Sequence, residues 1–127
     1  MLTVEAGRLQ SPFGNDPFAL VAQAFGNLFP KREYTAYIAA DVKDEDGNSV
    51  CGVTTFPGDG LPPVVEVSGE IPIAAGVEVL AHELAHVATP EDHTHGDAWR
   101  AVFDRIFEEY NRIAQELFGV AFTNDEE

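Results

Sequence analysis

The sequence predicts an α+β domain made of an N-terminal helix, a small three-stranded sheet and two further helices. Apolar residues recur at helical spacing before residue 30 and again after residue 72. The segment between them holds short runs rich in β-branched and aromatic residues, separated by turn signals. A length of 127 residues is that of one domain with its own core. We therefore interpret residues 1–127 as a single domain, in which residues from about 120 to 127 form an acidic tail.

The first helix is predicted to begin at Asn15-Asp16-Pro17, where a capping side chain is followed by proline in the first turn. Pro30 marks its end, because proline cannot continue a helix. The apolar residues between these limits lie at helical spacing; they are Phe18, Val21, Phe25 and Leu28.

Three strands are predicted next. The first covers Tyr34 to Val42, and after the turn signal Asp46-Gly47-Asn48 the chain returns as a second strand over Val50 to Phe56. The third strand covers Val64 to Ser68. Two prolines directly before it, Pro62 and Pro63, cannot donate to a ladder and indicate a strand at the edge of the sheet.

The last two helices are predicted over residues 73–88 and 96–118. The first carries few charges and is apolar nearly all round, which is typical of a buried helix. One of its stripes contains Ile73, Val77, Leu80, Leu84 and Val87, and roughly opposite lie Ala75, Val79, His82 and His86. The inward stripe of the second contains Trp99, Val102, Phe103, Ile106, Tyr110, Ile113 and Leu117, with Asp104, Glu108 and Arg112 pointing away.

Composition limits the possible partners and compartment. The formal net charge is −15, from 22 acidic and 7 scattered basic residues, and such a chain is repelled by duplex DNA. This charge keeps an acidic surface soluble, and it is also compatible with basic or unfolded polypeptide substrates. No segment has the composition of a signal peptide or a membrane span. Cys51 is the only cysteine, so no internal disulfide can form and we expect a cytoplasmic protein. We expect Cys51 itself to be a small buried hydrophobe, because its surroundings do not match a metal-binding context.

The segment His82-Glu83-Leu84-Ala85-His86 predicts a divalent metal site, most simply zinc. His82 and His86 stand at i and i+4, so both rings lie on one face of the helix within reach of one ion. Glu83 follows the first ligand, where its carboxylate can take a proton from a water molecule at the open position of the metal.

A catalytic zinc site usually has three protein ligands, and the third is predicted to be His95. His95 lies on the core-facing stripe with Trp99, and a sharp turn after Pro90 can bring it back over the first of the two helices. His93 and Glu109 remain alternatives, whereas Glu108 faces solvent. Asp92 and Asp97 are candidates for hydrogen bonds to a ligand imidazole, although solvation and helix capping explain them equally well.

The two segments His82-Glu83-Leu84-Ala85-His86 and His95-Gly96-Asp97-Ala98-Trp99 together resemble the SprT-like zinc metallopeptidases. The resemblance covers roughly residues 64–107. It implies a zincin-like fold, Zn²⁺ held by three histidines and a glutamate general base. These roles fall on His82, His86 and His95 as ligands and on Glu83 as the base. The chain lacks the cysteine-rich zinc ribbon of many relatives, and its charge does not suit their DNA-linked members.

We accordingly expect a zinc-dependent peptidase in which Glu83 activates water against a peptide carbonyl. An extended substrate could pair with the strand Val64 to Ser68 if that strand forms the sheet edge. A further donor usually stabilises the oxyanion. The candidates for it are His93, Tyr34, Tyr37 and Tyr110, and core packing is an equally good role for each tyrosine.

Two other functions fit parts of the pattern. A deformylase-like amidase would recruit a cysteine as third ligand, and Cys51-Gly52 is the only candidate, without the sequence context expected around it. A non-catalytic zinc module would close the site with four ligands, for example all four histidines of residues 82–95. Glu83 argues against this module, since a structural site gains nothing from a carboxylate there.

Overall fold

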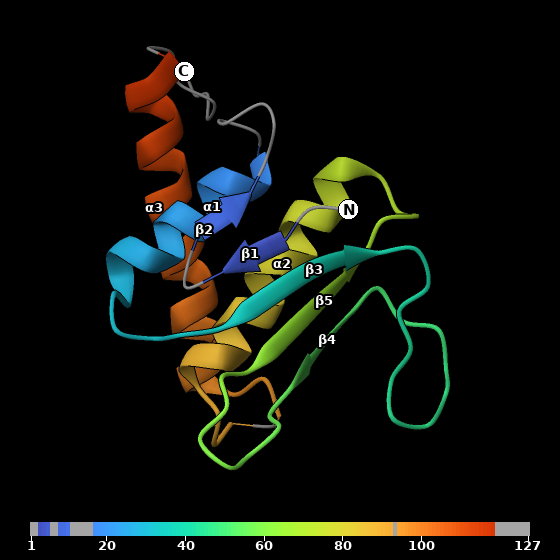
Figure 1. The fold of residues 1–127 in the computed structure, drawn as a ribbon. Helices are drawn as coiled ribbons and strands as arrows, with labels where there is room; N and C mark the ends of the chain where they lie inside the picture. The colour runs from blue at the N-terminus through green and yellow to red at the C-terminus, as the bar shows by residue number, and fades with distance from the viewer. Residues whose placement is uncertain (1–2, 6–7, 11–16, 93, 119–127) are drawn as a thin grey trace.

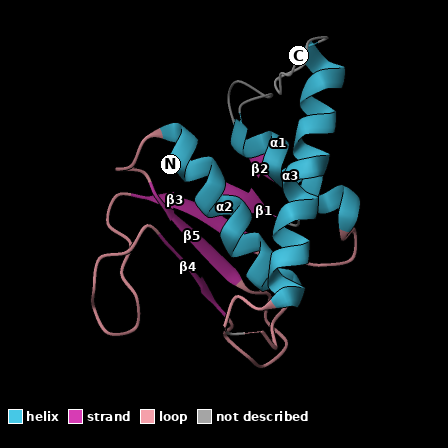
Figure 2. Ribbon diagram, turned by 180° about the vertical axis from the view of Figure 1, so that it is seen from behind, coloured by secondary structure: helices cyan, strands magenta, loops and turns pink. Residues whose placement is uncertain are grey.

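The computed structural model describes residues 3–5, 8–10, 17–92 and 94–118. Its architecture is α+β, as the sequence predicts: a mixed sheet forms one layer, and three helices cover one face of it. Figures 1 and 2, seen from opposite sides, show the sheet in front of the helices and then the helices in front of the sheet. Among the described residues, no helix has the length and apolarity needed to cross a membrane.

The helices and the third predicted strand lie where the sequence places them. The helices are α1 (Pro17–Leu28), α2 (Ile73–Ala88) and α3 (Asp97–Phe118). The strands are β1 (Thr3–Glu5), β2 (Arg8–Gln10), β3 (Thr35–Ala39), β4 (Gly52–Thr55) and β5 (Val64–Ser68). β3 and β4 are shorter than predicted, and β1 and β2 were not predicted. Asn15 and Asp16, the predicted start of α1, lie outside the described residues.

The prediction that Val64–Ser68 forms the sheet edge is wrong. The strand order is β2-β1-β3-β5-β4, so β5 is an interior strand, parallel to β3 and antiparallel to β4. Pro62 and Pro63 precede the ladder rather than interrupt it, and the Pro63 carbonyl accepts a hydrogen bond from the N–H of Thr35 at 3.0 Å. The end of the sheet on this side is therefore β4.

The turn between β3 and β4 forms as predicted, but the two strands do not pair as neighbours. Asp44 Oδ1 accepts hydrogen bonds from the N–H groups of Asp46 and Asn48 at 2.9 and 3.0 Å. Gly47 adopts φ +85°, a conformation that favours glycine. Beyond this turn the strands diverge, and β5 lies between them.

The core lies between the sheet and the helices. Its largest fully buried side chains include Phe25 of α1, Leu84 of α2 and Ile106 of α3, packed with Val65 and Val67 of β5. The inward stripe predicted for α3 is buried or half-buried at every described side chain, and Asp104, Glu108 and Arg112 are exposed. Ile73 was predicted to belong to the buried stripe of α2, and this prediction is wrong: Ile73 is the first residue of the helix and is 65% exposed. The rest of that stripe fixes the orientation of α2 and turns its other face toward β4.

Candidate metal centre

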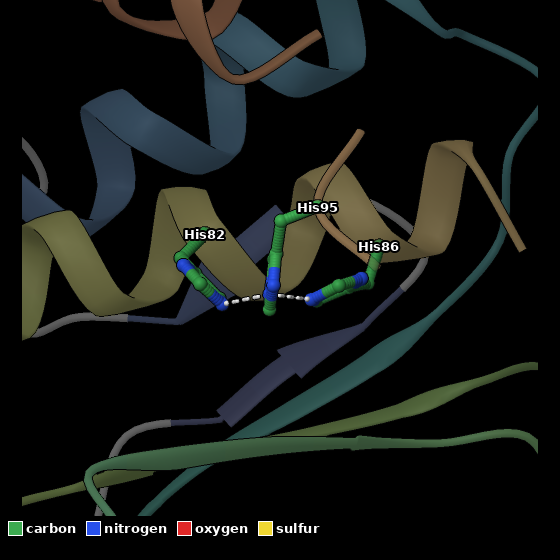
Figure 3. A group of neighbouring side chains, drawn as sticks. All are labelled: His82, His86 and His95. Carbon is green, nitrogen blue, oxygen red and sulfur yellow. Dashed lines mark hydrogen bonds between the residues drawn. The ribbon is translucent and has the colours of Figure 1, made fainter. Parts of the chain in front are cut away.

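Three histidine side chains converge beside α2. His82 and His86 extend from successive turns of the helix, and His95 reaches over them from the connection to α3 (Figure 3). The Nε2 atom of His95 lies 3.1 Å from Nε2 of His82 and 3.0 Å from Nε2 of His86. Among the described residues these three form the one group whose ligand atoms could share a metal ion, with all three nitrogens within 4.8 Å of one another. The predicted third ligand, His95, is thus in the place that a ligand requires.

The donor set fits a zinc ion. Zinc bonds imidazole nitrogens at about 2.0–2.1 Å, and in a tetrahedron this places two nitrogens about 3.3 Å apart. Two of the three separations, 3.0 and 3.1 Å, are close to that value, and the pair His82 and His86 lies within 4.8 Å. All three residues present the same ring nitrogen, so an ion among them would take three protein ligands and keep a fourth position open.

The position of His95 depends on the turn that joins α2 to α3. His95 adopts φ +57°, a left-handed conformation that is uncommon for a residue other than glycine. The turn is held by Asp92, whose Oδ1 accepts hydrogen bonds from the N–H groups of Thr94 and Gly96 at 3.1 Å. Its Oδ2 accepts one from the N–H of Trp99, at 3.2 Å, in the first turn of α3. These three backbone donors hold the pKa of Asp92 at about 2.

Trp99 supports the histidine cluster from the core side. Its indole Nε1–H donates to the carbonyl oxygen of His82 at 3.2 Å, which ties α3 to the ligand-bearing turn of α2. The indole ring also contacts the rings of His82 and His95, with centroids 4.8 and 4.7 Å apart. The histidine rings are therefore packed against the indole ring of Trp99.

Glu83 lies beside the cluster and is buried, with 6% of its surface exposed. Its Oε1 accepts a hydrogen bond from Oγ1 of Thr54 in β4, at 2.6 Å. Burial raises the pKa of the Glu83 carboxyl, and the hydrogen bond from Thr54 opposes this rise. A carboxylate with a raised pKa next to an open metal position is suited to accept a proton from water.

Burial also acts on the first histidine. The pKa of His82 is lowered by desolvation and by the neighbouring His95, and Glu78 acts in the opposite direction. The neutral imidazole is the form that binds a metal ion, so this environment favours ligation.

The site opens into a hollow of about 330 Å³ between α2 and β4. Its wall includes the three histidines and Glu83, together with Gly52, Val53, Thr54 and Phe56. The hollow is open to solvent and the exposed Phe56 forms part of its wall, so a chain segment could reach the histidines from outside.

The alternative third ligands are placed elsewhere or lie outside the described residues. Glu109 accepts hydrogen bonds from Arg112 and from Nδ2 of Asn27, which hold its pKa at about 2. It is not a member of the histidine group, and Glu108 is exposed on α3. His93 lies outside the described residues. Of the two aspartates proposed as partners of a ligand ring, Asp92 instead organises the turn.

The described tyrosines do not line the hollow. Tyr34 is buried in the core against the edge of Phe25, and Tyr110 packs against Phe107. Burial raises the pKa of both phenols. A packing role therefore accounts for these two residues.

The prediction that Cys51 is buried is wrong. Cys51 directly precedes β4, at the end of the sheet, and its side chain is exposed as a free thiol. It is not part of the group that could share a metal ion, which removes the structural basis for a deformylase-like ligand set.

Sequence reasoning missed the two residues of β4 that shape the site. Thr54 holds the carboxylate of Glu83, and Gly52 lets the strand approach α2 closely. A Cβ atom added at Gly52 would lie 2.4 Å from Cγ1 of Val79 and 3.2 Å from Oε2 of Glu83. A glycine inside a predicted strand is itself a signal of such close approach, and Gly52 could have been found on that ground.

Comparison with protein-family models, curated proteins and solved structures gives no match for this chain. The functional assignment accordingly rests on the geometry of the site and on the motif.

Proposed function

We propose that this protein is a zinc-dependent peptidase in which His82, His86 and His95 bind the metal and Glu83 is the general base. The observation that supports it best is the combination of three converging Nε2 atoms with a buried carboxylate beside them. A structural zinc site would have no use for that carboxylate. The hollow in front of the histidines adds room for a substrate.

Each residue of the site then has a chemical task. A bound zinc ion supplies a Lewis acid that lowers the pKa of water toward about 7 and polarises a carbonyl group. Glu83 accepts the proton from the attacking water and delivers it to the leaving amine. Thr54 holds one oxygen of Glu83 so that the other can face the water.

The same proposal relates the chain to the SprT-like peptidases and their zincin-like fold, on the strength of the two motif segments. An extended peptide would pair with β4, which ends the sheet beside the hollow. The acidic surface favours unfolded or basic polypeptides over nucleic acid. The single exposed thiol suits a reducing compartment, and we place the enzyme in the cytoplasm.

The test combines metal analysis with proteolysis of unfolded casein. Four proteins are compared after zinc is supplied and the excess removed: the wild type and the variants Glu83→Gln, His82→Ala and His95→Ala. We expect one equivalent of zinc in the wild type and in Glu83→Gln, but weakened binding in both histidine variants. Proteolysis should be present in the wild type and absent from these three variants. Glu108→Gln, an exposed glutamate of α3, is the control and should behave as the wild type.

The possible failures are distinguishable. A wild-type protein that retains no zinc after zinc is supplied would contradict the metal site itself. Zinc retained in His95→Ala removes His95 from the ligand set. Zinc bound in full, with no cleavage of casein or of short flexible peptides, contradicts the peptidase.

A further inference from the structure

A second hollow adjoins the metal centre on the side away from His95. It also measures about 330 Å³ and shares Gly52, His82 and Glu83 with the first. The remainder of its wall comes from Cys51 on the sheet side and from Ala75, Glu78 and Val79 of α2. His82 and Glu83 thus line both hollows, so a peptide crossing the site could place one side chain in each, on either flank of the bond to be cleaved.

The second hollow borders the close contact between β4 and α2. β4 and α2 touch where Gly52 meets Val79, because no Cβ atom separates them. On α2, Ala75 and Glu78 lie one turn apart, and His82 follows Glu78 at i+4 on the same face. The result is a recess with Ala75 and Val79 as apolar residues of its wall, next to His82 and Glu83 and with Glu78 also in the wall.

Glu78 is the charged group that this recess offers to a ligand. Its side chain is exposed and, among the described residues, forms no side-chain hydrogen bond or salt bridge; its electrostatic neighbour in the site is His82. The other carboxylate of the wall, Glu83, is buried and already bonded to Thr54. No lysine or arginine lines the recess, so the charge of Glu78 is not neutralised locally.

We propose that this recess is a substrate subsite for a lysine or arginine side chain next to the scissile bond, with Glu78 as the residue that sets this preference. The inference rests on the proposed peptidase function and adds its substrate class. The aliphatic stem of such a side chain would lie against Val79 and Ala75, and its cationic end would reach the Glu78 carboxylate. The first hollow has no counterpart of Glu78: besides the site residues, its wall includes Val53 and the exposed Phe56. The preference for a basic residue therefore applies to one flank of the bond alone.

The experiment uses the zinc-loaded full chain and two flexible peptides that differ at one position. One peptide carries lysine beside the cleaved bond, and the other carries norleucine, which keeps the aliphatic stem and removes the charge. The flank that takes the lysine is identified first, by mapping the cleavage sites of unfolded casein by mass spectrometry. We then compare kcat/KM on the two peptides for the wild type, Glu78→Gln, Glu78→Lys and the surface control Glu108→Gln.

We expect the wild type and Glu108→Gln to favour the lysine peptide by about two- to fivefold, the range for a solvent-exposed ion pair. This preference should shrink as salt is added. Glu78→Gln should lose it with unchanged zinc content and unchanged kcat/KM on the norleucine peptide. Glu78→Lys should reverse it.

Two results would overturn the subsite while leaving the peptidase intact. One is equal cleavage of the two peptides by the wild type. The other is a lysine preference that persists in Glu78→Gln. A wild type that binds zinc and cleaves neither peptide nor casein would instead reject the peptidase function, and the subsite with it.

Discussion

At the scale of single residues, the site is defined by how the carboxylate of Glu83 is held. The side chain is buried beside three histidines, and burial raises its pKa. A single hydroxyl, that of Thr54, fixes one of its oxygens at 2.6 Å. Removing this hydroxyl would leave a buried acceptor oxygen of Glu83 without a hydrogen bond, which is energetically costly.

Replacing Thr54 with valine should therefore impair the chemical step. Valine keeps the shape of threonine and removes the donor, so Glu83 loses its fixed orientation. We expect kcat on a peptide substrate to fall by about tenfold, equivalent to about 1.4 kcal/mol, with KM little changed. Thr54→Ser restores a hydroxyl and should recover most of the rate. Equal kcat values for the valine variant and the wild type would show that the hydroxyl is not needed.

The predictability of these residues differs for a physical reason. His82, Glu83 and His86 were predicted because helical periodicity places them within two turns of each other. His95 followed from its place at the start of the next helix. Thr54 was not predicted, because it is 29 residues from Glu83 in sequence and meets it only through the packing of β4 on α2.

At the scale of elements, the contact between β4 and α2 decides whether the site is assembled. This contact has no room for a side chain at Gly52, where an added Cβ would come within 2.4 Å of Val79. We expect Gly52→Ala to destabilise the fold by about 1–3 kcal/mol, because the strand must move away from the helix. Urea unfolding measures the loss.

A double-mutant cycle tests the cause of that loss. Val79→Ala removes the atom with which the new methyl group would collide. The double variant Gly52→Ala/Val79→Ala should therefore lose less stability than the sum of the two single variants. Strict additivity would show that the collision with Val79 is not the source of the effect.

The turn between α2 and α3 has its own pH dependence through Asp92. Its pKa is about 2 in the folded protein, below the ordinary value of 3.8, because backbone N–H groups donate to the carboxylate. Folding lowers the pKa of Asp92, so the ionised carboxylate stabilises the folded protein. This stabilisation is complete above about pH 4 and is lost as the pH falls through about 2. Asp92→Ala should lower Tm at pH 6, and the difference from the wild type should shrink between pH 4 and pH 2. Asp97→Ala, an exposed change nearby, is the control; an Asp92→Ala effect that is the same at both ends of the range would contradict this account.

At the scale of the whole molecule, the sequence predicted which elements form better than it predicted how the strands are ordered. The bounds of α2 and β5 agree with the prediction because their apolar patterns are local. The interior position of β5 between β3 and β4 depends on pairings between distant segments, and prolines at 62 and 63 gave a misleading local signal. Cys51 was misplaced for the same reason, since its exposure follows from β4 lying at the end of the sheet.

The three proposed ligands come from two parts of the chain, so metal binding would be a property of the whole molecule. His82 and His86 belong to α2, whereas His95 belongs to the connection to α3, so an ion among them would cross-link the two helices. Zinc at about one hundred times its Kd should stabilise the wild type by about 2.7 kcal/mol, and a chelator should remove this gain. The variant His95→Ala should gain less from the same zinc concentration in thermal unfolding. An identical gain in the variant would mean that the ion does not join the helices.

The contact between Trp99 and the histidines gives the protein an optical consequence. Trp99 is the only tryptophan of the chain, and its ring lies 4.8, 5.7 and 4.7 Å from the rings of His82, His86 and His95. Indole emission responds to the charge of groups in contact with the ring, and a dication arriving among these imidazoles would alter that charge. The intrinsic fluorescence of the unlabelled protein would then report, from one residue, whether the three histidines are occupied.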